Sequence, residues 1–271
     1  MLLNFNKQAK WFNIEIAFHI SGVKERRMVK DSRCITGIET LDSELNGGIP
    51  TGSTVLISGG SGVGKTTLSM QFLANGIVKG ERGVFFTATE TIPKLKRFQG
   101  VYDFFDEKLI KSGDLSVIDL WSISDRLGLN SECYSYEEVN ILFEVIRDIT
   151  KELDAKRLII DSITSLCYRI QTREAIRDFL FKLGSSLTAL MCTTFLTSEI
   201  PPRIFQYSQY EIEEFIADGI IFLGDIERKG DLIRTLQVIK MRGTAHGRSR
   251  FVLSMTSKKG IELAPMLKSE L

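Results

Sequence analysis

One stretch of the sequence decides the fold: Gly59-Gly60-Ser61-Gly62-Val63-Gly64-Lys65-Thr66-Thr67. From Gly59 to Thr66 it matches the pattern G-x-x-x-x-G-K-[ST]. The run before it, residues 53–58, is short, apolar and β-branched, which is typical of a buried parallel strand. The run after it, residues 68–77, repeats apolar residues on one helical face. A strand, a glycine-rich loop and a helix are the context that this pattern requires.

The residue types in this loop suit the binding of a nucleoside triphosphate. Its glycines let consecutive backbone N–H groups turn inward on an anion, and the start of the next helix adds partial positive charge. Lys65 would reach the β- and γ-phosphates, and the Thr66 hydroxyl would ligate Mg²⁺. A glycine-rich turn that binds nothing is the alternative, but the Lys-Thr pair has no packing reason to occur there. A dinucleotide fold is disfavoured, because G-x-G-x-x-G lacks this lysine and has a different spacing.

The composition is that of an ordinary globular protein. With 271 residues the chain is long enough for one large α/β domain. The net charge of +1 provides no global basic field that would favour nucleic acid. The four cysteines are scattered, which favours buried free thiols in a reducing compartment over a metal site. Since no apolar run approaches the ~20 residues of a membrane span, we expect no membrane contact and a cytoplasmic location.

The first 27 residues differ from the rest of the chain. Apolar residues alternate strictly with others over residues 12–20, which predicts a half-buried strand. This strand could lie at the edge of the same subunit's sheet or add to the sheet of a neighbour. Met28 could also be the natural start. We therefore divide the chain into an N-terminal extension, residues 1–27, and a nucleotide-binding domain, residues 28–271.

The rest of the chain predicts a mostly parallel sheet between helices, followed by antiparallel hairpins. The expected strands after the loop cover residues 84–89, 115–120, 156–162 and 189–197, and the expected helices cover residues 136–153 and 173–184. Beyond residue 218 the pattern changes to hairpins over residues 219–227, 232–241, 250–255 and 260–263. This is the order of an α/β domain built around the phosphate-binding loop at residues 59–67 (the P-loop), with an antiparallel C-terminal part.

Polar side chains end three of the predicted parallel strands: Glu90, Asp161 and Ser198. Ligands of such sheets bind at the carboxyl ends of the strands. Asp161 suits the second carboxylate around Mg²⁺, although it could instead cap the next helix, a role that Ser162 could share. Glu90 could orient and deprotonate the attacking water, or it could be a solvated carboxylate at a helix start.

A basic segment follows the last long strand, Lys240-Met241-Arg242-Gly243-Thr244-Ala245-His246. In an extended segment Lys240 and Arg242 point to the same side, so they could clamp a γ-phosphate, and we expect it to be that of a neighbouring subunit. Alone, the segment would more often be an ordinary solvated turn.

Together these stretches resemble the KaiC family of RecA-like ATPases. The resemblance covers residues 32–265 and includes Thr36-Gly37-Ile38, Leu41-Asp42, Gly47-Gly48-Ile49-Pro50-x-Gly52, the P-loop, Glu90, Asp161-Ser162 and the basic segment. It implies ATP and Mg²⁺ as cofactors and a homo-oligomeric, usually hexameric, ring with ATP bound between neighbours. Lys240 and Arg242 would then act on the neighbour's γ-phosphate, and His246 would lie near its nucleotide.

The chain departs from the clock proteins of this family in two ways. Those proteins have two such domains and a Glu-Glu pair, where this chain has one domain and Thr89-Glu90, as in archaeal RadA recombinases. Their phosphorylated Ser-Thr pair corresponds to residues 213–218, which read EEFIAD and offer no hydroxyl acceptor. Of the activities of the clock proteins, we therefore expect only the ATPase activity in this chain, and not self-phosphorylation.

Three functions remain open at this point. The first is an ATP-hydrolysing, ring-forming regulatory switch with an unknown protein partner. The second is a RadA-paralogue-like recombination regulator that binds single-stranded DNA through the loop holding Arg203, Phe205, Tyr207 and Tyr210. Three glutamates close behind this loop make it a poor electrostatic site for DNA. The third is a protein that binds ATP to assemble and barely hydrolyses it.

Overall fold

The computed structural model describes residues 32–129, 133–201 and 206–266. The chain divides into two compact units, Met1–Ser32 and Arg33–Leu271, and everything below concerns the second. The strand predicted over residues 12–20 lies outside the described residues, and the boundary at residue 28 stays a prediction.

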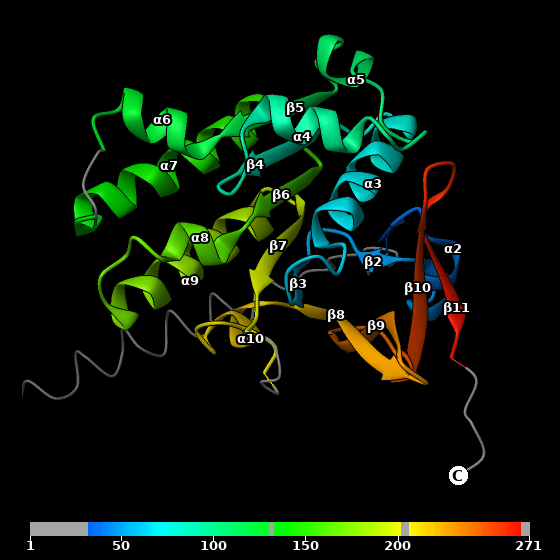
Figure 1. Cartoon of the computed structure of the whole chain (residues 1–271). Helices are drawn as coiled ribbons and strands as arrows, with labels where there is room; N and C mark the ends of the chain where they lie inside the picture. Colours follow the sequence, from blue (N-terminus) through cyan, green and yellow to red (C-terminus); the bar gives the residue numbers. More distant parts are fainter. Residues whose placement is uncertain (1–31, 130–132, 202–205, 267–271) are drawn as a thin grey trace, which may run out of the picture. The chain divides into compact units, whose positions relative to one another are not determined.

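The second unit is built on a nine-stranded sheet in the order β11-β10-β9-β8-β3-β7-β6-β4-β5 (Figure 1). The six neighbours from β8 to β5 are parallel, and β9, β10 and β11 continue the sheet as antiparallel strands. The strands are β3 (Thr54–Gly59), β4 (Gly83–Thr87), β5 (Leu115–Asp119), β6 (Arg157–Asp161), β7 (Thr193–Glu199), β8 (Gly219–Arg228), β9 (Asp231–Met241), β10 (Arg250–Thr256) and β11 (Gly260–Pro265). A separate pair joins β1 (Arg33–Cys34) to β2 (Ile49–Pro50). The predicted fold class is confirmed.

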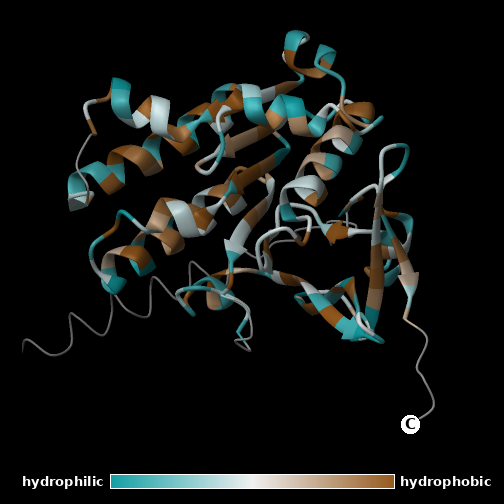
Figure 2. Cartoon of the chain, in the orientation of Figure 1, coloured by the Kyte–Doolittle hydropathy of each residue, from teal (hydrophilic) through white to brown (hydrophobic). Residues whose placement is uncertain are grey.

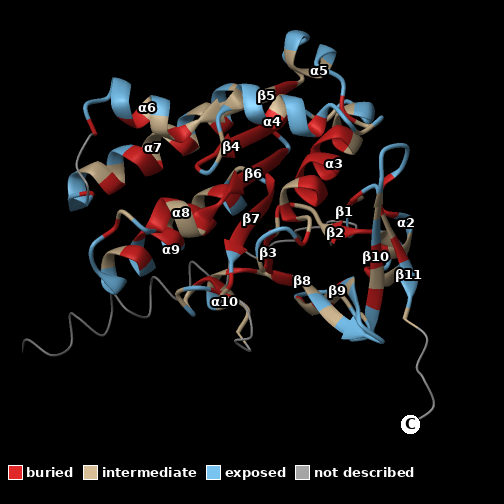
Figure 3. Cartoon of the chain, viewed as in Figure 1, coloured by how far each residue is buried: buried red, intermediate tan, exposed pale blue. Residues whose placement is uncertain are grey.

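Both faces of the parallel part are covered, because successive residues of its strands enter two different cores. On β3, Val55 and Ile57 pack in the core that contains the helix after the P-loop, whereas Leu56 packs in the core on the other face. Strands β3, β4 and β6 are buried along their whole length (Figure 3). In Figure 2 these strands are mainly brown, while the outer helices carry teal residues. Because these strands are buried on both faces, their sequences are continuous apolar runs and do not alternate between apolar and polar residues.

The helices of the described chain lie between and around these strands. They are α2 (Glu39–Glu44), α3 (Lys65–Val78), α4 (Ile92–Gln99), α5 (Lys108–Lys111), α6 (Leu120–Arg126), α7 (Tyr136–Glu152), α8 (Ile163–Cys167), α9 (Arg173–Ala189) and α10 (Glu213–Ile216). Helix α3 packs in the first core, and α7 and α9 pack in the second. None of these helices is long and apolar enough to cross a membrane.

Several predicted boundaries were shifted: the strand predicted over residues 189–197, for example, is β7 at Thr193–Glu199. Two of the shifts have a clear local reason. Helix α9 does not end at Gly184 but continues to Ala189. Gly184 serves close packing instead, since a Cβ there would lie 2.8 Å from a side-chain carbon of Ile216 on α10. Strand β5 ends at Asp119 rather than at Leu120, because the Asp119 carboxylate accepts hydrogen bonds from two backbone N–H groups and caps α6.

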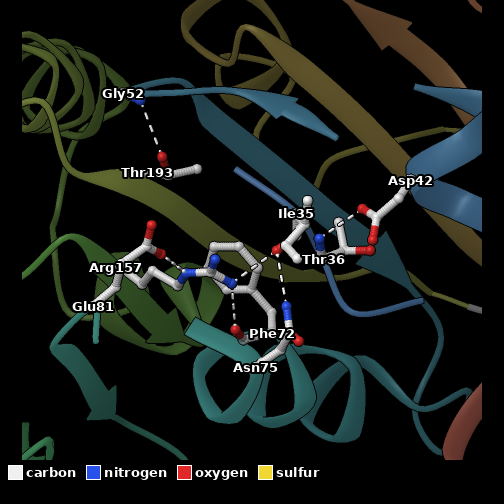
Figure 4. A network of polar contacts seen from close by, with 9 residues as sticks. All are labelled: Ile35, Thr36, Asp42, Gly52, Phe72, Asn75, Glu81, Arg157 and Thr193. Carbon is white, nitrogen blue, oxygen red and sulfur yellow. Dashed lines mark hydrogen bonds and ion pairs between the residues drawn. The ribbon is translucent and has the colours of Figure 1, made fainter. Parts of the chain in front are cut away.

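A buried arginine fastens the start of the described chain to the sheet and to α3 (Figure 4). Arg157 on β6 has 1% of its surface exposed, and its guanidinium lies 4.5 Å from the ring centroid of Phe72. It donates hydrogen bonds to the backbone carbonyls of Ile35 (2.8 Å) and Phe72 (2.7 Å) and to the carboxylate of Glu81 (2.6 Å). Gly76 on α3 leaves room for it, because a Cβ at that position would clash with the guanidinium.

The cysteines are free, as expected, but they are not all buried. Cys34, Cys167 and Cys192 are buried, and burial raises the pKa of each of these thiols. Cys133 is exposed. Three of the four thiols therefore behave as small core side chains.

Candidate nucleotide-binding site

The P-loop connects the end of β3 to the start of α3. Gly62 and Gly64 have φ angles of 81° and 106°, which only glycine adopts without strain. The Lys65 ammonium folds back over the loop and donates to the carbonyls of Gly59 (2.9 Å) and Gly60 (2.7 Å). The loop therefore wraps around its own lysine at the N-terminus of a 14-residue helix, where an anion is favoured.

Burial and nearby carboxylates have opposite effects on the pKa of Lys65. Its side chain is buried, and this burial lowers the pKa of its ammonium, while the nearby carboxylates of Glu199 and Asp161 oppose the shift. A triphosphate would add negative charge at the same place. An anion bound beside Lys65 would therefore stabilise the charged form of its ammonium.

Asp161, at the end of β6, faces the P-loop rather than the next helix. One carboxylate oxygen accepts a hydrogen bond from the Thr66 hydroxyl (2.6 Å), and the other accepts one from Thr197 (2.5 Å). The cap of α8 is Ser162, whose hydroxyl accepts from the N–H of Ser165. Ser162 therefore caps α8, and Asp161, for which this role was also considered, does not. Burial raises the pKa of the Asp161 carboxyl, and the hydrogen bonds and Lys65 oppose this.

Glu90 lies on the rim of the same cavity, with 28% of its side chain exposed. Its carboxylate pairs with Lys94 at 3.3 Å, one turn into α4. The Thr87 hydroxyl bonds both the N–H and the carbonyl of Glu90 and so fixes its backbone. This position allows contact with a bound phosphate or water, and it also suits a solvated residue before a helix, so both roles stay open.

These groups surround a cavity of about 340 Å³. Its lining consists of Ser61, Gly62, Gly64, Lys65, Thr66, Thr67, Thr89, Glu90, Tyr102, Asp161, Glu199 and Met255. Glu199, Tyr102 and Met255 were not predicted as site residues. Ser198, which was considered, is buried, and its hydroxyl lies 3.2 Å from that of Thr164. The acid one residue further along β7 is the one that reaches the cavity, because β7 pairs with β3 so that Glu199 lies beside Gly59.

Lys240 and Arg242 lie near the starts of the parallel strands, opposite the edge that holds the P-loop. Met241 pairs with Gly219 at the start of β8, and Gly219 pairs with Val55 near the start of β3, whereas the P-loop follows the end of β3. The Lys240 ammonium donates to the carbonyls of Glu214 (3.0 Å) and Ala217 (2.7 Å). Arg242 pairs with Asp218 at 3.2 Å. Both cations therefore face the segment around α10 of their own chain and not its P-loop.

His246 and the proposed DNA loop have local contacts in the described chain. His246 is half-buried, and its Nδ1 lies 2.7 Å from the carbonyl oxygen of Gly247. The Tyr207 ring packs edge-on against Phe222 (5.7 Å between centroids), and the Tyr210 hydroxyl donates to the carbonyl of Thr164 (3.3 Å). These two tyrosines take part in packing, whereas Arg203 and Phe205 lie outside the described residues.

Comparison with known proteins agrees with this geometry. The model of the KaiC ATPase family matches residues 34–268. The chain belongs to the KaiC ATPase family. It is 35% identical to the UPF0273 protein of Thermotoga maritima over 86% of this chain and 96% of that one. It is 34% identical to the circadian clock oscillator protein KaiC of Parathermosynechococcus lividus over 85% of this chain, but spans only 42% of that protein.

A solved structure gives the same result. The KaiC-like protein of the hyperthermophilic archaeon Pyrococcus horikoshii superposes with a TM-score of 0.74 at 35% identity, covering 86% of this chain and 99% of that one. Membership of this family supports ATP binding and ATPase activity in general, and it favours the KaiC-like function over the recombination regulator.

Proposed function

We propose that this chain hydrolyses ATP with Mg²⁺ in a ring of identical subunits and that its nucleotide state acts as a regulatory switch. One observation carries the proposal. The P-loop, Asp161 and Glu90 line one cavity, while Lys240 and Arg242 lie at the opposite end of the same sheet. A site that uses both groups needs two copies in head-to-tail contact, and such contacts form a ring when the rotation between copies closes.

Thr66 and Asp161 are suited to hold Mg²⁺. Their oxygens lie 2.6 Å apart beside the P-loop, and hydroxyl and carboxylate oxygens are the ligands that this ion prefers. The described residues contain no group of three or more His, Cys, Asp or Glu that could hold a metal. Phosphate oxygens and water would therefore supply the other ligands, as is usual for this ion. Bound there, Mg²⁺ would neutralise charge on the phosphates.

The remaining residues of the cavity have separate tasks in this proposal. The Lys65 ammonium exchanges its two backbone carbonyls for phosphate oxygens. Glu90 orients the attacking water and accepts its proton, a contribution of about 10²–10⁴ in rate. Residues Gly59 to Thr67 hold the phosphates through the loop backbone and the start of α3.

The cations of the next subunit complete the site. Lys240 and Arg242 are held at the surface by backbone carbonyls and by Asp218, so a neighbour's γ-phosphate would compete for them with uncharged oxygens and one carboxylate. An arginine in this role contributes about 10³–10⁵ in rate. His246 follows in the same segment and would lie near the same nucleotide.

The proposed output is a change in the ring that a protein partner detects. Residues 213–218 hold the contacts of Lys240 and Arg242, so a phosphate that draws these cations away would free this segment. The proposal places the protein in the cytoplasm, where ATP and Mg²⁺ are available.

Hydrolysis measured with and without single-stranded DNA tests the proposal. We expect Mg²⁺-dependent release of phosphate that DNA does not change, with Lys65→Ala as the blank. A several-fold stimulation by DNA would favour the recombination regulator instead. ATP-dependent assembly without turnover would leave ATP as an assembly ligand and contradict the proposed hydrolysis.

A further inference from the structure

Glu90, the residue proposed to activate the attacking water, lies in a connection between two regular elements. Strand β4 ends at Thr87, and α4 begins at Ile92. A general base must lie within hydrogen-bond reach of the water that it activates, and a misplacement of about 1 Å can cost about 100-fold in rate. The contacts that hold the backbone of this connection therefore affect how well Glu90 can act.

The connection is held by hydrogen bonds to three parts of the chain. The Thr87 hydroxyl accepts from the N–H of Glu90 (3.1 Å) and donates to its carbonyl (2.8 Å), which closes the connection on itself. The N–H of Ala88 donates to the carbonyl of Asp161 (2.7 Å), at the end of the neighbouring strand β6. The carbonyl of Ala88 accepts from the indole N–H of Trp121 (2.7 Å). Because Ala88 is 3% exposed, water cannot readily replace the indole there.

Trp121 is itself fixed at both its backbone and its ring. Strand β5 pairs with β4 so that Asp119 lies opposite Thr87, and Asp119 caps α6 by accepting from the backbone N–H of Trp121 (3.0 Å). The guanidinium of Arg169 covers the ring, with 4.2 Å between its carbon and the ring centroid. The indole N–H is thus presented to the connection from a side chain that has little freedom to move.

Packing alone is the simpler explanation of Trp121, since its half-buried ring lies against the second core. An aromatic ring without a donor could fill the same space, and a buried indole N–H usually finds some partner. Here the partner is the carbonyl two residues before Glu90, in a residue whose own N–H is bonded to β6. The hydrogen bond therefore joins α6 to the segment that carries the proposed base.

We propose that Trp121 is a positioning residue for Glu90. By anchoring the carbonyl of Ala88, it holds the connection so that the Glu90 carboxylate stays within reach of the attacking water. The described residues that line the nucleotide cavity do not include Trp121, so it acts through the backbone and not by contact with the nucleotide. This inference rests on the proposed role of Glu90 as the base.

Single-turnover hydrolysis and calorimetric titration of the full chain, both with ATP and Mg²⁺, test the inference. Trp121→Phe keeps an aromatic ring and removes the indole N–H. It should slow hydrolysis by roughly 10-fold, less than the loss of the base itself, and leave ATP affinity unchanged, because the P-loop holds the phosphates. Tyr134→Phe is the matched control. It removes a buried hydroxyl that lies 3.1 Å from that of Ser124 in the same core, and it should change neither rate nor affinity.

Combining Trp121→Phe with Glu90→Gln separates positioning from general damage. If Trp121 acts through Glu90, the double variant should hydrolyse ATP no more slowly than Glu90→Gln alone, because no base remains to be positioned. Losses that multiply would show that Trp121 acts elsewhere and would overturn the inference. A wild-type rate for Trp121→Phe, or a loss of ATP affinity as large as the loss of rate, would overturn it as well.

Glu90→Gln alone distinguishes the failure of this inference from that of the proposed function. If Glu90→Gln hydrolyses ATP at the wild-type rate, Glu90 is not the base, and the inference fails together with that part of the proposed function. If Glu90→Gln is slow while Trp121→Phe is as fast as wild type, the base is correctly placed and only the role of Trp121 is wrong.

Discussion

Replacing Arg157 with methionine should lower the free energy of unfolding by about 3 kcal/mol. Methionine keeps an unbranched stem of similar length, so the change removes mainly the guanidinium, which lies 4.5 Å from the Phe72 ring centroid. A hydrogen bond from a charged donor contributes about 1.5–3 kcal/mol. We take about 1.5 kcal/mol for each of the two buried carbonyl contacts, which gives about 3 kcal/mol together. The low value is appropriate because the carbonyl of Ile35 keeps the Asn75 amide at 3.4 Å as a second donor.

The third contact, to Glu81, should add little. Its side chain is 37% exposed, so water can replace the guanidinium there, and half-exposed pairs contribute up to about 1 kcal/mol. Glu81→Gln is therefore the matched control and should cost less than about 1 kcal/mol. In a chain of this size, a loss of about 3 kcal/mol corresponds to a fall in Tm of roughly 6–12 °C.

Urea unfolding followed by far-ultraviolet circular dichroism measures both variants. The m value should stay constant, so that a lower midpoint reports lower stability. If Arg157→Met unfolds within about 1 kcal/mol of wild type, or if Glu81→Gln costs as much, the buried carbonyl contacts do not carry the stability assigned to them.

The other predictions concern the nucleotide site. Glu90→Gln should keep ATP affinity and slow steady-state hydrolysis by about 10²–10⁴, and an unchanged turnover number would place the base elsewhere. Asp161→Asn should remove the Mg²⁺ dependence of ATP binding measured by titration, and a dependence that persists would argue against the metal role. Burial lowers the pKa of Lys65, so ATP affinity should fall as pH rises through that pKa and the ammonium loses its proton. Because the Glu199 carboxylate raises the pKa of Lys65, Glu199→Gln should move this fall to lower pH, and a profile that does not move would show that the two groups are uncoupled.

The sequence predicts those parts of the site that local patterns encode. The P-loop and the helix after it follow from glycine spacing and helical periodicity, and Asp161 follows from its place at the end of an apolar strand. The parallel strands were recognisable because they are buried on both faces and therefore continuously apolar.

The parts that were missed depend on tertiary contacts. Tyr102 and Met255 are far apart in sequence but line the same cavity. The Asp103 N–H, next to Tyr102, donates to the carbonyl of Ser257 in the β10–β11 turn, and the same turn bonds to Gln71 of α3. Gly184 has the sequence signature of a helix end, yet it lies inside a helix because Ile216 packs on it. Glu199 could have been found, since it directly follows the predicted strand-end Ser198.

Mixing two inactive variants tests the central claim, an active site shared between neighbouring subunits, most directly. Lys65→Ala lacks the phosphate-binding lysine, and Arg242→Ala lacks the cation proposed to act on the neighbour. In an equal, random mixture about a quarter of the head-to-tail contacts join an intact P-loop to an intact Arg242, so about a quarter of wild-type ATP turnover should return. If mixed rings form, as shown by co-purification of differently tagged subunits, and turnover stays at the level of the separate variants, the site is not shared.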